Sequence, residues 1–270
     1  MRTTLALFAC AIAAGQDIHF DHVHLNSTDP AAAIEFYTGH FECEKAQYDG
    51  HDAVRAGKVW LLFNKVDQAP PSDLVSAIWH IGWGAEDMKA TYQKQLDQGT
   101  VFQTQITDIS GLAGRAGFYY AYVDGPDHAL IELNTSNHHH FGHLHLFSAD
   151  PIAAGEFYIK NFGAKGRGSG SREPRFYKGF QVAPAMSLMS DDVNIIIFPI
   201  EHARQNAPEI WKGRTSFAPT SGRVIDHIAF SVPDPNAAVE RLKANGVAVK
   251  GNMVDGPDGV SIELVGARAQ

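Results

Sequence analysis

Histidine and glutamate recur at matched positions of this 270-residue sequence, and together they have the chemistry of a metal site. Imidazole nitrogens and carboxylate oxygens are suitable ligands for borderline divalent metals. Two histidines and one carboxylate on the same face of a site leave positions open for water, oxygen or substrate. The recurring side chains are His22, His80, Glu132, His143, His227 and Glu263.

The recurrence belongs to an internal repeat. The segments from His22 to Phe41 and from His143 to Phe162 align without a gap, and twelve of their 20 positions are identical. Weaker matches join Trp79–Asp87 to Asp226–Asp234 and Asp124–Asp127 to Asp255–Asp258. The chain therefore contains four similar units. The fourth unit is 16 residues shorter in its middle, which predicts the loss of a strand or a hairpin loop.

Each unit begins with an apolar alternating run, which predicts a strand. An aspartate follows, often with proline next, and this pair is typical of a helix start. Further apolar runs predict that additional strands complete each unit. The expected first strands are Phe20–Leu25, Ile78–Trp83, Phe141–Phe147 and Ile225–Val232, and the clearest helices are Ala31–His40 and Asn236–Asn245.

The run DHVHLNSTDPAAAIEFY, with the later runs DGPDHALIEL and DGPDGVSIEL, resembles the vicinal oxygen chelate superfamily. That superfamily includes glyoxalase I, fosfomycin- and bleomycin-resistance proteins and extradiol dioxygenases. The resemblance implies an α+β fold in which four βαβββ modules pair into two open, curved β-barrels. The expected domains are residues 17–135, with modules 18–66 and 76–135, and residues 138–266, with modules 141–200 and 223–266.

The resemblance also implies how the ligands group. One metal set would be His22, His80 and Glu132, and the other would be His143, His227 and Glu263. Glyoxalases use a further acid, but Leu62 occupies the matching position, and three protein ligands fit dioxygenase-like or fosfomycin-transferase-like members better. A single strand histidine is more often a hydrogen-bonded core residue than a ligand. Four matched histidines with two matched glutamates disfavour that alternative.

Three more side chains are candidates for a substrate pocket. His24 and His145 lie two residues beyond a predicted ligand, so the period of a strand places them on the same face. Either histidine could orient a substrate or transfer a proton, or could simply fill the floor of the barrel. Tyr122 matches a substrate-facing tyrosine of extradiol enzymes, although aromatic strand residues are more often core.

Composition narrows the class of protein. The net charge of −8 and the lack of a Lys/Arg-rich run argue against a nucleic-acid partner. Arg2 followed by the apolar run 5–14 predicts a signal peptide over residues 1–15, and hence a secreted or periplasmic protein. No later apolar run reaches the length of a membrane span. Signal removal would leave Cys43 as the single cysteine, so no intrachain disulfide is expected.

The sequence thus predicts a metal-dependent enzyme that acts on a small substrate with vicinal oxygens, with dioxygenase-like chemistry as the favoured reaction. Fe(II) or Mn(II) is the favoured cofactor, and Zn(II) is also compatible with these ligands. Two alternatives stay open. One is a non-catalytic binding protein of the bleomycin-resistance type, and the other is a metal-dependent lyase, isomerase or transferase. The sequence does not choose between the two halves as the active one.

Overall fold

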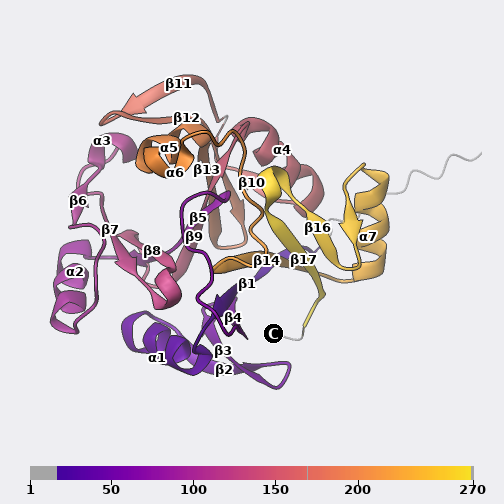
Figure 1. Cartoon of the computed structure of the whole chain (residues 1–270), viewed down its shortest axis with the longest axis horizontal. Helices are drawn as coiled ribbons and strands as arrows, with labels where there is room; N and C mark the ends of the chain where they lie inside the picture. The colour runs from indigo at the N-terminus through magenta and orange to yellow at the C-terminus, as the bar shows by residue number, and fades with distance from the viewer. Residues whose placement is uncertain (1–16, 169, 269–270) are drawn as a thin grey trace, which may run out of the picture.

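The computed structural model describes residues 17–168 and 170–268, and it has an α+β fold with two mixed sheets (Figure 1). The expected signal peptide lies outside the described residues. The first sheet has the order β15-β16-β17-β14-β1-β4-β3-β2 within the described part. Its strands are β1 (His19–Ser27), β2 (Glu44–Tyr48), β3 (His51–Ala56), β4 (Val59–Lys65), β14 (Ile225–Val232), β15 (Val249–Lys250), β16 (Met253–Asp255) and β17 (Ser261–Gly266).

The second sheet has the order β10-β12-β13-β9-β5-β8-β7-β6, with β11 paired to β12 outside that path. Both sheets have free edge strands at each end of the order, so they are not closed barrels. The strands of this sheet are β5 (Ile78–Ala85), β6 (Thr107–Asp108), β7 (Tyr119–Asp124), β8 (Leu130–Thr135), β9 (Phe141–Ser148), β10 (Lys165–Gly166), β11 (Ser171–Tyr177), β12 (Phe180–Ser190) and β13 (Val193–Pro199).

The module pairing differs from the expectation. β1 pairs antiparallel with β14, and β5 pairs antiparallel with β9, so the first module joins the fourth and the second joins the third. The lengths of the connections explain this pairing, because a short connection keeps the two modules that it joins side by side. Only residues 136–140 separate β8 from β9, whereas residues 66–77 and 200–224 separate the other modules. The prediction that each sequence half forms its own barrel was wrong.

The helices begin where the aspartates predicted. Aspartate side chains accept backbone N–H bonds at the starts of α1, α2, α4 and α7, and proline follows at three of these starts. Figure 1 shows these four helices at the periphery of the molecule. The described helices are α1 (Pro30–His40), α2 (Met88–Asp97), α3 (Ser110–Ala113), α4 (Pro151–Phe162), α5 (Ile200–Asn206), α6 (Pro208–Trp211) and α7 (Pro235–Ala244), with single turns at Pro126–His128 and Pro257–Gly259.

The fourth module keeps three strands after its helix, so no strand is lost relative to the second module. Its β15 and β16 are short, and the described residues contain no counterpart of the loop that carries α3. The 16 residues by which the fourth unit is shorter therefore correspond to a loop of the second module. None of the described helices is long and apolar enough to span a membrane.

Strand alternation separates the core from the candidate site. Val23, Ile81, Leu144 and Ile228 each follow a candidate ligand directly, and each is fully buried in the main hydrophobic core. Successive strand residues point to opposite faces. The candidate histidines consequently point away from this core, toward the other face of their sheet.

Candidate metal sites

A β-bulge precedes each candidate histidine on the four first strands. The register of β1 against β14 shifts between Phe20 and His22, and the register of β5 against β9 shifts between Ile78 and His80. A bulged residue loses its ladder pairing and re-aims neighbouring side chains. The residue just before the histidine can then place its side chain on the same face of the sheet as the histidine. The residues skipped by the pairing are Asp21, Trp79, Gly142 and Asp226.

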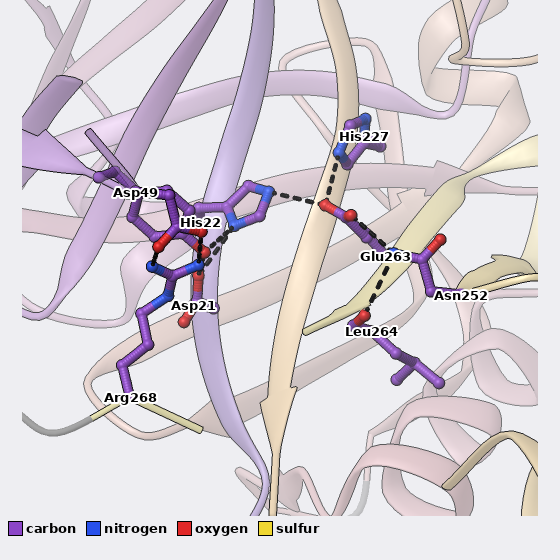
Figure 2. A network of polar contacts seen from close by, with 9 residues as sticks. Asp21, His22, Asp49, His227, Asn252, Glu263, Leu264 and Arg268 are labelled. Carbon is purple, nitrogen blue, oxygen red and sulfur yellow. Dashed lines mark hydrogen bonds and ion pairs between the residues drawn. The ribbon is translucent and has the colours of Figure 1, made fainter. Parts of the chain in front are cut away.

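The first-sheet site brings together His22 from β1, His227 from β14 and Glu263 from β17. Each histidine places Nε2 3.3 Å from Oε2 of Glu263 (Figure 2). Ligands about 2.0–2.2 Å from one cation stand roughly 3–3.5 Å from each other. Each of the two histidine–glutamate distances therefore fits a pair of ligands on one cation.

The two bulged aspartates orient the histidines of this site. Nδ1 of His22 lies 2.8 Å from Oδ1 of Asp21, and Nδ1 of His227 lies 2.6 Å from Oδ1 of Asp226. A carboxylate that accepts the Nδ1–H bond fixes the tautomer and leaves Nε2 as the ligand atom. Tyr48 adds a donor, since its hydroxyl donates to Asp21 over 2.7 Å.

The charges at this site are strongly coupled. Burial alone would lower the pKa of His227, but bonds to Asp226 and Glu263 outweigh it and raise the pKa to about 9. The bonds from His22 and His227 hold the pKa of Glu263 well below its usual range, against the opposing effect of burial. Without a metal, an imidazolium proton of His227 therefore occupies the site at neutral pH. A bound cation would replace that proton.

His24 lies beside the first-sheet site, as its spacing predicted. Its ring centroid is 4.6 Å from that of His227, and candidate ligand atoms of His22, His24 and His227 all lie within 4.8 Å of one another. Its buried Nδ1 has no hydrogen-bond partner. Burial lowers the pKa of His24 to about 4, with the neighbouring histidines acting in the same direction. The ring is a neutral base near pH 7.

The second-sheet site brings together His80 from β5, Glu132 from β8 and His143 from β9. Nε2 of His80 is 3.2 Å from Oε2 of Glu132, and Nε2 of His143 is 3.6 Å from Oε1. Burial alone would raise the pKa of Glu132, but the two histidines outweigh that effect and lower the pKa to about 2. Burial lowers the pKa of His143 to about 4. An ionised carboxylate thus lies among buried imidazoles, and this donor set also fits a cation.

His145 and Tyr122 belong to the surroundings of the second-sheet site. Their ring centroids lie 4.9 and 5.1 Å from that of His80. Burial keeps the pKa of His145 well below the ordinary histidine value. Burial and the charge of Glu132 raise the pKa of Tyr122. Both side chains therefore stay neutral at physiological pH.

The six predicted ligands form two clusters, but the grouping differs from the expectation. The set of His22, His80 and Glu132 does not come together, nor does the set of His143, His227 and Glu263. His22 exchanges partners with His143 because the sheets pair the first module with the fourth. The proposed role of all six as metal ligands stays a prediction.

Sequence reasoning missed the orienting aspartates and Tyr48. The signal was present in the pairs Asp21-His22 and Asp226-His227, since the other two histidines follow Trp79 and Gly142. Strict strand alternation would place the aspartates on the opposite face, so only the bulges reveal their role. Cys43 is a free, partly buried thiol whose pKa burial raises to about 12.

Comparison with known proteins gives a consistent result. The family model described as Glyoxalase/Bleomycin resistance protein/Dioxygenase superfamily matches residues 19–133 and 140–264. The fold is similar to glyoxalase I from Zea mays, with a TM-score of 0.64, 15% identity and 93% of each chain covered. It is also similar to a putative dioxygenase from Bacillus subtilis, with a TM-score of 0.56, 12% identity, and 91% of this chain and 84% of that chain covered. Comparison with curated proteins gave no match.

Proposed function

Because the chain belongs to the Glyoxalase/Bleomycin resistance protein/Dioxygenase superfamily, we propose that it is a metal-dependent enzyme for a small substrate with vicinal oxygens. We place the reaction at the first-sheet site. The observation that carries this choice is the pair of Asp–His contacts that aim two Nε2 atoms at Glu263. The side chain of Glu263 is 24% exposed, against 11% for Glu132, so a substrate has better access here.

The finer proposal is dioxygenase-like chemistry with Fe(II) or Mn(II). Two histidines and one carboxylate are a donor set typical of oxygenases, and Zn(II) is a less suited occupant for oxygen chemistry. When bound, the metal would hold and polarise the two substrate oxygens. Both atoms of O2 would enter the organic product, so the reaction needs no other reductant.

The chain's own residues would supply orientation and proton transfer. Asp21 and Asp226 keep the ligand rings in one tautomer, and Tyr48 holds Asp21 in place. His24 is neutral and its buried Nδ1 has no partner, so it is suited to accept a proton from a substrate hydroxyl. Export of the protein, predicted from residues 1–15, remains part of this proposal.

The test combines metal analysis with oxygen uptake. Protein prepared without a His-tag is loaded anaerobically with Fe(II) or Mn(II), and O2 consumption is followed with a panel of catechols. We expect catechol-dependent uptake that Glu263→Gln abolishes, whereas Glu173→Gln, a change on the exposed β11, leaves it intact. Absence of bound metal, or full uptake by Glu263→Gln, would contradict the proposal. Ligand binding that survives both His22→Ala and Glu263→Gln would instead favour a non-catalytic binding protein.

A further inference from the structure

The two sites differ in what covers them. We propose that α5 and α6 seal the second-sheet site, so that a cation held by His80, Glu132 and His143 exchanges slowly and stabilises the fold. This inference rests on the proposed function only in that the chain takes up a divalent cation. It assigns the two sites different roles: the first-sheet cation meets substrate, and the second-sheet cation is structural.

The nitrogen atoms of the second-sheet site are deeply buried, and Glu132 is the acidic side chain that they face. His80 is 0% exposed; its Nδ1 has no hydrogen-bond partner, and its Nε2 faces Oε2 of Glu132 at 3.2 Å. Nε2 of His143 is buried and makes no hydrogen bond, and it lies 3.6 Å from Oε1 of the same carboxylate. Buried polar atoms are nearly always paired, and a buried carboxylate is costly without a compensating charge. A cation among these nitrogens and Glu132 would satisfy both requirements.

Aromatic rings form the layer over this cluster. The Trp79 ring lies 4.6 Å from His80 and 5.0 Å from His202 of α5, measured between centroids. Phe198 lies 4.4 Å from His145 and 5.2 Å from His202. His202 itself is only 7% exposed. The imidazole of α5 therefore closes the layer above the ligands.

The segment that supplies His202 is packed as a core. Ile200, Ala203 and Trp211 are buried in a second hydrophobic cluster that also contains Trp79. The indole Nε1 of Trp211 donates to the carbonyl of Leu74 over 2.8 Å, which ties α6 to the segment before β5. Nδ1 of His202 lies 2.9 Å from the carbonyl of Gln181 on β12. These contacts hold α5 and α6 in a fixed position over the second-sheet site.

Within residues 17–168 and 170–268, no helix follows β4 or β17 of the first sheet as α5 and α6 follow β13 of the second. The last strand of the first sheet, β17, is followed in the described part only by Ala267 and Arg268, and no helix lies after it. Arg268 packs over the ring of Tyr48 and pairs with Asp49 at the edge of the site (Figure 2). The asymmetry therefore comes from residues 200–211, the first part of the connection from β13 to β14, in which α5 packs on the second sheet.

The experiment uses Mn(II) as the probe and the full-length chain. Wild-type protein loaded with Mn(II) is challenged with excess EDTA, and release is followed by the change in water-proton relaxation as Mn(II) passes from the protein to EDTA. We expect two Mn(II) per chain, with one released at least 100-fold more slowly than the other. Glu132→Gln should remove the slow phase and lower the Tm of the loaded protein, and Glu263→Gln should remove the fast phase.

A substitution in α5 that opens the cover provides a second, independent test. His202→Ala should keep two Mn(II) per chain but accelerate the slow phase at least 10-fold, while Phe176→Ala, at an exposed aromatic on β11, should change neither rate. A single release phase, or two Mn(II) in Glu132→Gln, would overturn the inference. One Mn(II) that depends on Glu263 alone would overturn it and leave the proposed function standing. No bound Mn(II) or other metal would overturn both.

Discussion

Gly82 gives a sharp test of the second-sheet site because it stands directly opposite His143 across the β5–β9 ladder. A Cβ added at Gly82 would lie 1.9 Å from Cε1 and 2.2 Å from Nε2 of His143. Contacts under 3.0 Å essentially never occur for real Cβ atoms, so the ring must move. Gly82 does not have positive φ, which makes the ring the main target of the substitution.

The size of the displacement decides the outcome. The ring must shift by roughly 1 Å, whereas metal–ligand distances tolerate only about ±0.2 Å. We expect Gly82→Ala to weaken cation binding at this site by at least the roughly 10–100-fold that loss of an orienting residue produces. Strain in the packed face should also lower the free energy of unfolding by about 1–3 kcal/mol.

The assay is Mn(II) titration of Gly82→Ala with counting of bound ions, together with thermal unfolding. The matched control is Ala229→Gly, because Ala229 stands opposite His22 in the first sheet and already carries the Cβ that Gly82 lacks. The control should keep both ions and lose only about 0.5–1 kcal/mol as a strand glycine. If Gly82→Ala bound Mn(II) with wild-type stoichiometry and affinity, the geometry argued for His143 would be refuted.

Three other predictions follow from the first sheet and its supports. Asp226→Asn should weaken first-sheet Mn(II) binding roughly 10–100-fold and lower the pKa of His227, which NMR titration would show; an unchanged pKa would contradict the orienting role. The folded-state pKa of His227 is raised from 6.5 to about 9, so its stabilisation of the metal-free protein is complete below pH 6.5 and is lost as the pH rises through 9. The free energy of unfolding, measured across this pH range, should fall by at most about 3 kcal/mol. A free energy of unfolding that does not change with pH would contradict the raised pKa of His227. Asp127→Ala removes an acceptor for the Ser27 hydroxyl and the Thr28 N–H, so denaturant unfolding should show a loss of about 1–3 kcal/mol; no change would mean that this contact is dispensable.

The repeat made the local structure and the donor residues predictable. Aspartate followed by proline marked the helix starts because both features act within a few residues of one another. The matched histidines and glutamates identified the side chains that the fold gathers. Each of these signals is local, so a single sequence carries it.

The grouping of ligands was not predictable from the repeat itself. Four similar first strands can pair in more than one way, and only the lengths of the connections favour β5 beside β9. The bulges at Asp21 and Asp226 also escaped detection, since alternation alone assigns these side chains to the other face. Residues 200–211 fell between the predicted modules, because two short helices give no lasting periodicity.

The crossed arrangement of modules has a consequence for biosynthesis. His24 pairs with His227, so β1 must wait for β14, which is synthesised after every strand of the second sheet. The second sheet needs only residues up to β13 and can be assembled while the last module is still in the ribosome. The first-sheet site, where we propose that the reaction occurs, is thus completed last. A chain stopped before β14 would retain His22 without His227 and Glu263, and its first-sheet site would stay incomplete.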